Sequence, residues 1–108
     1  MPKINRQFGP TCSYNLRIVK NLVAQGRVQI NQNALEHAYN DFGWGEKQIL
    51  DVFKRLQQKH FSTSKPSEKI SFCWLDYYKG NFDGEEVFTH FYINDENILV
   101  INSFHIDR

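Results

Sequence analysis

Alternating apolar and polar side chains in the last third of the chain constrain the fold more than any other feature. Two such runs, within residues 87–104, flank a short polar segment. Period-two alternation on both sides of a turn is typical of a β-hairpin. With Asp95 and Glu96 in the turn, Ile93 is expected to face Ile98, and this pair sets the register of every pair beyond it. The sequence therefore predicts two paired strands at its C-terminal end.

The predicted register divides the hairpin into two faces. One face is apolar and is expected to pack on a hydrophobic core: Val87, Phe91, Ile93, Ile98, Val100 and Phe104. The other carries two histidines, a hydroxyl group and aromatic rings, and is where function is expected: Phe88, His90, Tyr92, Leu99, Ile101, Ser103 and His105. Because His105 would lie opposite Glu86, it would be on the order of 13 Å along the strand from His90, at ~3.3 Å per residue. At that separation the two histidines would not act on one phosphate.

Apolar residues at helical spacing precede the hairpin and predict three helices. The first helix is expected to begin at about Asn15 and to stop at Gly26. The second is expected to be capped by Asn31 or Asn33 and to end at Gly43, and the third to begin near Gly45 or Glu46. The side chains expected to face inward are Leu16, Val19, Leu22 and Val23, then Leu35, Ala38, Tyr39 and Phe42, then Ile49, Val52, Phe53 and Leu56. The second and third helices are expected to form a helical hairpin.

Two further segments complete the predicted architecture. Residues 28–30 are expected to form one short strand, and residues 59–69, which contain Pro66, a loop or a short edge strand. The fold class is therefore α+β, with three N-terminal helices packed on a mostly antiparallel β-sheet.

The chain length allows one domain with a substantial core. Of its 108 residues, 41% are hydrophobic, so we expect a single domain at 13–108 after a flexible N-terminal arm at 1–12. No stretch approaches the ~18 uninterrupted apolar residues of a membrane span, and the N-terminus lacks the apolar segment of a signal peptide. A cytoplasmic protein is the expectation. Cys12 and Cys73 have no metal-ligand spacing and are expected to be free thiols rather than a disulfide or metal site.

Charge is distributed unevenly along the chain. Residues 1–65 hold ten Lys or Arg and four Asp or Glu, a balance of +6, whereas residues 66–108 hold three and eight, a balance of −5. The basic half is suited to attract a polyanion, and the acidic half to repel one or to meet a basic partner. The alternative is ordinary solvated surface charge.

Candidates for acid/base chemistry are side chains that titrate or carry charge near neutrality. They are His60, Lys65, Tyr77, Tyr78, His90 and His105. Taken singly, each is more often structural than catalytic. Aromatic side chains on the strands are suited to stack on unpaired bases, although such residues are more often part of a core: Phe88, Tyr92, Tyr77 and Tyr78.

Several segments, in unbroken order over residues 14–105, resemble the MqsR family of toxins. Residues 15–23 with 26–28 resemble the family's opening L-x-x-V-K-x-L-V-x-x-G-x-V, and residues 33–35 continue it. Residues 74–78, WLDYY, are similar to the family's W-Q-D-V-Y, and residues 86–88 lie where the family has Q/E-V-Y-L-K. Residues 98–105, ILVINSFH, are similar to its closing V-L-I-V-S-F-K.

This resemblance implies a RelE-like α+β fold and an endoribonuclease toxin of a type II toxin–antitoxin module. Such toxins cut mRNA without a metal or other cofactor and are held inactive by a cognate antitoxin. The chain departs from the family at the proposed catalytic positions. Lys65 stands two residues after the lysine of F-Y-K-S-M-T, Leu75 replaces the glutamine of W-Q-D-V-Y, and Phe88 replaces the tyrosine of V-Y-L-K. His90 and His105 stand where the family has lysines.

The leading hypothesis is therefore a metal-independent mRNA endoribonuclease in which His105 and Lys65 are central. A ribonuclease must deprotonate the 2′-hydroxyl, protonate the leaving 5′-oxygen and neutralise the charged transition state, and these two side chains meet part of that need. The other expected participants are His90, Tyr78 and His60 in catalysis and Phe88, Tyr77 and Lys59 in RNA binding. The alternative is a catalytically inactive RelE-like protein that binds a protein or RNA. The oligomeric state is left open.

Overall fold

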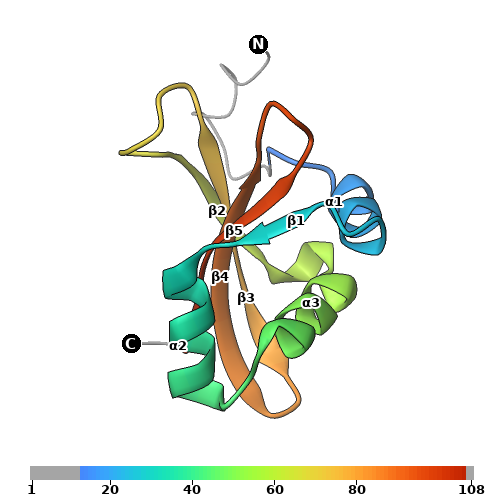
Figure 1. Ribbon diagram of the computed structural model, residues 1–108, viewed down its shortest axis with the longest axis vertical. Helices are drawn as coiled ribbons and strands as arrows, with labels where there is room; N and C mark the ends of the chain where they lie inside the picture. The colour runs from blue at the N-terminus through green and yellow to red at the C-terminus, as the bar shows by residue number, and fades with distance from the viewer. Residues whose placement is uncertain (1–12, 107–108) are drawn as a thin grey trace.

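The computed structural model describes residues 13–106, which form a five-stranded sheet with three α-helices (Figure 1). The strands are β1 (Val28–Ile30), β2 (Phe61–Pro66), β3 (Trp74–Phe82), β4 (Glu85–Ile93) and β5 (Leu99–Ile106). The helices are α1 (Leu16–Ala24), α2 (Gln32–Phe42) and α3 (Glu46–Arg55), followed by the 3₁₀ turn η2 (Gln58–His60). The strand order is β1-β5-β4-β3-β2, and only the β1–β5 pair is parallel. The predicted α+β class is confirmed. The predicted N-terminal arm and Cys12 lie outside the described residues.

The first helix forms as its sequence predicts. Asn15 caps it, because the Asn15 side chain accepts a hydrogen bond from the backbone N–H of Arg17 at 2.7 Å. Its buried residues are Val19, Leu22 and Val23. The chain then turns at Gly26, whose φ of 74° is a conformation that glycine adopts at little cost.

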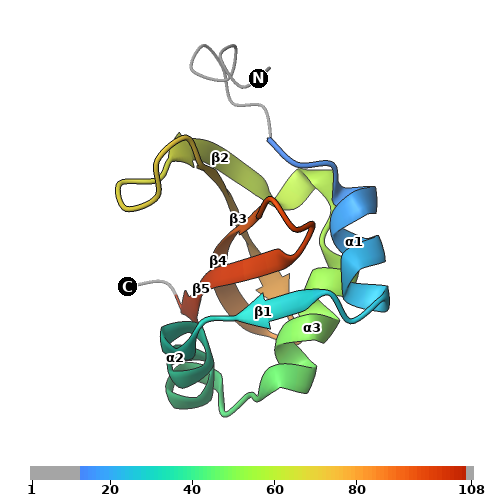
Figure 2. The ribbon, with the colours of Figure 1, turned by 45° about the horizontal axis from the view of Figure 1, so that its top comes forward.

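Helices α2 and α3 do not form the predicted helical hairpin. Helix α3 packs beside α1, whereas α2 packs on β5 (Figure 2). The inward face of α2 was also predicted incorrectly in part: its buried residues are Ala34 and Ala38, and Tyr39 is 70% exposed. With Ala34 and Ala38 facing the core, the helical turn places Tyr39, one residue after Ala38, on a different side of the helix.

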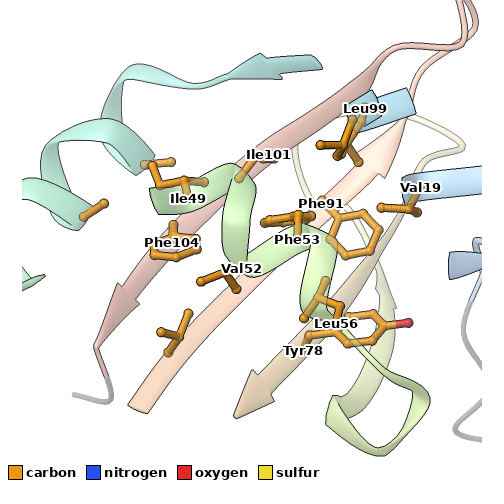
Figure 3. Close-up of a cluster of buried hydrophobic side chains, with 14 of the residues drawn as sticks. Val19, Ile49, Val52, Phe53, Leu56, Tyr78, Phe91, Leu99, Ile101 and Phe104 are labelled. Atoms are coloured by element: carbon orange, nitrogen blue, oxygen red, sulfur yellow. The ribbon is translucent and has the colours of Figure 1, made fainter. Parts of the chain in front are cut away.

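The hydrophobic core lies between α1, α3 and one face of the sheet (Figure 3). Phe91 of β4 lies at its centre, with Phe53 of α3 at a ring-centroid distance of 5.3 Å and Tyr78 of β3 stacked at 5.5 Å. Each fully buried large apolar side chain contributes roughly 1.5–3 kcal/mol to folding. We call the sheet face that packs on this core the covered face, and the opposite side the open face.

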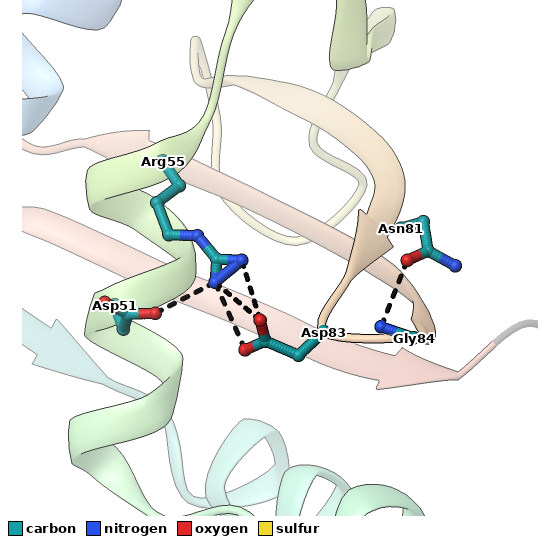
Figure 4. Close-up of polar contacts among 5 residues, drawn as sticks. All are labelled: Asp51, Arg55, Asn81, Asp83 and Gly84. Carbon is teal, nitrogen blue, oxygen red and sulfur yellow. Dashed lines mark hydrogen bonds and ion pairs between the residues drawn. The ribbon is translucent and has the colours of Figure 1, made fainter.

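A two-residue turn joins β3 to β4. Asp83 and Gly84 both have positive φ, 56° and 85°, as a type I′ turn requires. Arg55 of α3 pairs with Asp83, at 3.1 Å, and with Asp51 of its own helix, also at 3.1 Å (Figure 4). These pairs are partly exposed, so each contributes at most about 1 kcal/mol. They attach the end of α3 to the turn.

The turn between β4 and β5 is one residue longer than predicted. Asn94 N–H donates to the carbonyl of Ile98, and Asn97 takes a positive φ of 60°. Ile93 therefore pairs with Leu99 instead of Ile98. Because side chains alternate between faces, this shift reverses part of the predicted assignment. Leu99 and Ile101, predicted for the open face, lie in the core, and Val100, predicted for the core, alternates to the open face.

A β-bulge in β5 shifts the register by a second residue. Phe91 pairs with Ile101, but His90 pairs with Ser103, which leaves Asn102 as the extra residue. His105 therefore lies opposite Phe88 and not opposite Glu86. The predicted separation of the two histidines is wrong for this reason.

Candidate active site

Two rows of side chains cross the open face of the sheet. The first row comprises Tyr77 on β3, His90 on β4 and Ser103 on β5, which are direct cross-strand neighbours. The second row, two residues further along, comprises Lys79, Phe88 and His105 on the same three strands. His90 and His105 are thus diagonal neighbours, a relation that places side chains about 7–8 Å apart. The two histidines that the predicted register separated are brought together.

Each row contains a pair of neighbouring rings with a lysine ammonium over one of them. The Tyr77 and His90 rings lie 4.4 Å apart at 30°, and the Phe88 and His105 rings are nearly parallel, with centroids 6.2 Å apart. Lys65 Nζ, from β2, lies 5.1 Å from the centre of the Tyr77 ring. A second lysine, at position 79, holds its Nζ 5.9 Å from the Phe88 ring. Both contacts have the geometry of cation–π interactions.

Two adjoining hollows open on this face, and both are lined by Tyr77 and His90. The smaller, of about 200 Å³, is also lined by Ser62, Phe88 and His105. The larger, of about 470 Å³, is also lined by Lys65, Glu68, Lys69, Leu75 and Asn102. The histidine pair therefore faces space that is large enough for part of a polar ligand.

His90 is neutral at physiological pH. Burial lowers the pKa of its imidazole to about 4, and the Coulombic influence of nearby His105 and Lys65 acts in the same direction. Its Nδ1 lies 3.3 Å from Nδ2 of Asn102. Since an amide nitrogen only donates, Nδ1 is the acceptor and the ring proton is on Nε2.

His105 has the opposite proton arrangement. Its Nδ1 lies 2.7 Å from the carbonyl oxygen of Ile106, which only accepts, so Nδ1 carries a proton and Nε2 is the nitrogen that gains or loses one. The His37 ring, on α2, contacts the His105 ring edge-on at 6.3 Å. The Nδ1 atom of His37 is buried, and none of the residues described in the structure donates to it or accepts from it.

The chain matches one protein family over nearly its whole length. The model of the family described as "Motility quorum-sensing regulator, toxin of MqsA" matches residues 11–106. The chain belongs to this family. It is accordingly the toxin of a toxin–antitoxin module and has an antitoxin partner. Comparison with curated proteins finds no match. No helix within residues 13–106 is long and apolar enough to cross a membrane, and no three His, Cys, Asp or Glu side chains in that range are grouped to hold a metal ion.

The structure of the toxin brings together five of the residues predicted for its site. His90, His105, Lys65, Tyr77 and Phe88 all lie on the open face. Leu75, which stands where the family's glutamine is, lines the larger hollow. The open face thus holds the positions at which this chain departs from the family's motifs.

Three other predicted residues lie elsewhere in the toxin. The ring of Tyr78 is in the core, 5.5 Å from Phe61, because alternation turns it to the covered face when Tyr77 points outward. His60 lies against Phe82, with ring centroids 4.8 Å apart, and its Nδ1 accepts a hydrogen bond from the backbone N–H of residue 57. Lys59 lies beside it in a hollow formed with α1 and α3. Burial, followed by the charges of Lys59 and Lys20, lowers the pKa of His60.

Sequence reasoning missed the polar side chains that α2 directs toward β5. Asn33 Nδ2 donates to the backbone carbonyl of Asn102 at 3.2 Å, His37 contacts His105, and Asp41 accepts from the backbone N–H of Ile106 at 3.0 Å. The signal was present, because Asn33, His37 and Asp41 recur every four residues and so share one side of the helix. This stripe supplies polar partners to the part of β5 that extends beyond β1.

Proposed function

We propose that this toxin is a metal-independent endoribonuclease that cleaves mRNA in the cytoplasm, and that the open face of its sheet is the active site. The observation that carries the proposal is the diagonal pairing of His90 with His105, beside Lys65 and the exposed sides of Tyr77 and Phe88. Proton-transfer groups, a cation and aromatic surfaces are the components that RNA cleavage requires.

The proposed binding mode is that of a single-stranded RNA. Its bases stack on the rings of Tyr77 and Phe88, because every base has a flat face that suits an aromatic side chain. Lys65, which lies over the Tyr77 ring, then meets the cleaved phosphate, and Lys79, over the Phe88 ring, meets a neighbouring phosphate. A folded duplex would not offer unstacked bases to this surface.

The chemistry begins at the 2′-hydroxyl next to the cleaved phosphate. His105 Nε2 accepts the hydroxyl proton while the 2′-oxygen forms a bond to phosphorus. The bond from phosphorus to the 5′-oxygen breaks, and the departing oxygen takes a proton from water, which the open face admits. The hydroxide formed in this way removes the proton from His105 Nε2, which restores the neutral base. Lys65 and the Nε2–H of His90 donate to the phosphate oxygens as negative charge develops on them. The products are a 2′,3′-cyclic phosphate and a 5′-hydroxyl.

The departures from the family's motifs fit this assignment. Phe88 keeps an aromatic face but no hydroxyl, and Leu75 offers no hydrogen bond, so neither contributes to proton transfer. His105, which stands at a lysine position of the family, takes over that role, and His90, at another lysine position, donates a hydrogen bond to the phosphate. The rings of Tyr78 and His60 pack on the covered side of the sheet, although Tyr78 also lines the smaller hollow, and neither has a part in the proposed reaction.

Induced expression with mapping of RNA 5′ ends tests the proposal. Growth arrest and cuts at one short motif are expected for the parent chain, whereas His105→Ala lowers cleavage by about 10²–10⁴-fold. His60→Ala is the matched control on the covered side and is expected to cut at the parent rate. Cleavage by the purified toxin is expected to persist in a metal chelator.

Unchanged transcripts after induction, together with no cleavage by purified toxin, would overturn the ribonuclease proposal. The remaining function would then be that of a catalytically inactive protein that binds a protein or RNA.

A further inference from the structure

The bulge in β5 places an amide beside the ring of His90. Asn102 is the extra residue between the pairs Phe91–Ile101 and His90–Ser103. A bulge re-aims the side chain of its extra residue. Asn102 consequently lines the larger hollow next to His90, while Ser103 is the residue that pairs with His90.

Helix α2 fixes the direction of this amide. Asn31, the N-cap residue of α2, donates from its Nδ2 to Oδ1 of Asn102 at 2.9 Å. The Oδ1 atom therefore faces α2, and Nδ2 of Asn102 faces Nδ1 of His90 at 3.3 Å. A turned amide would oppose donor to donor at Asn31, so the direction is set by hydrogen bonding at both ends.

The same contact opposes a positive charge on His90. A second ring proton would have to bind Nδ1, where the Asn102 amide already points a hydrogen. Burial of the ring is the main cause of its lowered pKa, and His105 of β5 and Lys65 of β2 act in the same direction. Tyr77 of β3 covers one side of the ring, and the loop after β2 brings Glu68 and Lys69 to the same hollow. Of these groups, only the carboxylate of Glu68 favours the charged form of His90.

We propose that Asn102 is a positioning residue that holds His90 as a neutral Nε2–H hydrogen-bond donor to a phosphate oxygen, so that His105 alone of the two histidines exchanges a proton. The proposal deepens the ribonuclease function given above and rests on it. It assigns opposite tautomers to His90 and His105, because different hydrogen-bonding groups face their Nδ1 atoms. Nδ1 of His90 faces a donor, whereas Nδ1 of His105 faces the carbonyl acceptor of Ile106.

The tautomer is measured directly in the RNA-free toxin by ¹⁵N NMR of its histidine rings. In the parent chain at pH 7, His90 is expected to show a protonated Nε2 and an unprotonated Nδ1. Asn102→Asp, which replaces the donor with an acceptor of the same shape, is expected to move the proton to Nδ1 and to raise the pH at which His90 titrates. A parent His90 with its proton on Nδ1 would overturn the proposal.

A second variant acts on His90 without touching it. Asn31→Asp keeps a good helix N-cap but offers Asn102 an acceptor in place of a donor. The Asn102 amide is then expected to turn over, present Oδ1 to the ring and draw the His90 proton to Nδ1. Asn33→Asp is the matched control, because it adds the same charge close by at a residue whose side chain contacts the Asn102 backbone carbonyl and not the Asn102 amide. Equal spectra for Asn31→Asp and Asn33→Asp would contradict the proposal that Asn31 sets the His90 tautomer through the Asn102 amide.

Cleavage kinetics separate a donor role from proton transfer. His90→Gln supplies a neutral N–H and is expected to lose about tenfold in kcat, whereas His90→Leu supplies none and is expected to lose about 10²–10³-fold. Equal losses in both variants would show that His90 itself moves a proton. Because the NMR result does not depend on cleavage, the absence of ribonuclease activity and a wrong tautomer are distinguishable failures.

Discussion

Tyr77 and Tyr78 are adjacent in the chain, yet the two faces of the sheet give them different environments. Tyr78 is 1% exposed, with Phe91 and Phe61 against its ring. Tyr77 is half-buried, with His90 on one side and the Lys65 ammonium over it. The side chains of the covered face are thus held by apolar packing with α1 and α3, whereas those of the open face contact one another and leave room for a ligand.

His60 and His90 differ between the two faces in their hydrogen-bond partners and not in the direction of their pKa shifts. Burial lowers the pKa of both His60 and His90, so a shifted pKa does not distinguish them. Their partners do. Nδ1 of His60 accepts from a backbone N–H three residues away, whereas Nδ1 of His90 accepts from a side chain whose direction is fixed by a separate helix. Only the second arrangement joins distant parts of the chain at an open hollow.

Replacing each tyrosine in turn should give the largest contrast between the faces. Tyr78→Ala is expected to lower the free energy of unfolding by about 3–5 kcal/mol, because it removes a buried ring and leaves a cavity. Tyr77→Ala is expected to cost less than ~1 kcal/mol in stability but to weaken binding of single-stranded RNA by about 1–3 kcal/mol. Urea unfolding and RNA titration measure the two effects. Equal destabilisation by both variants would remove the distinction.

Replacing Lys65 and Lys59 separately tests whether lysine charge promotes RNA cleavage only on the open face. Lys65→Ala is expected to slow RNA cleavage about tenfold, because the ammonium beside His90 stabilises developing phosphate charge. Lys59→Ala removes the same charge from the side of α1 and α3 and is expected to leave the rate unchanged. Single-turnover cleavage of a short RNA measures both. Similar slowing by the two substitutions would indicate general attraction of RNA to the toxin.

The loss of folding stability at low pH should differ least between His90 and His60. The unfolded chain takes up a proton at His90 near pH 6.5, but the folded state, with its pKa of about 4, does not. Stability is therefore constant above about pH 6.5 and declines as the pH falls toward 4. His90→Gln is expected to reduce this decline by about 1 kcal/mol, after discounting for solvent screening. His60→Gln should reduce it less, because His60 lies in a more open position. Urea midpoints between pH 7 and 4.5 measure the slopes.

Much of the fold followed from local patterns in the sequence. The helix after Asn15, the strand at 28–30 and the α+β class were predicted and are present. They depend on apolar spacing and capping residues, which act over a few positions. His90 and His105 were also predicted to lie on the open face. Their predicted separation was wrong, because each extra residue between the turn and the end of the strand shifts all later pairs.

The turn between β4 and β5 combines local and distant contacts, since the Asn94 side chain accepts hydrogen bonds from the backbone N–H groups of Glu96 and Ile98. Asn97 takes its positive φ in a loop whose carbonyl at that position accepts a hydrogen bond from Nε of Arg27 at 3.1 Å. Arg27 lies 70 residues earlier and reaches the loop only because β1 pairs with β5. The site residue Asn102 was missed for a similar reason, since its bulge matters only when α2 presents Asn31 to it.

The sequence by itself determined the elements of this toxin, its family and the residue types available for chemistry. The tertiary structure decided which of those residues meet. Alternation along a strand has a period of two, so one extra residue in a turn or a bulge exchanges the faces and moves every later pair. Contacts between distant segments, from Arg27 to the β4–β5 turn and from α2 to β5, meet the chain at those two extra residues. The two extra residues together brought His105 next to His90.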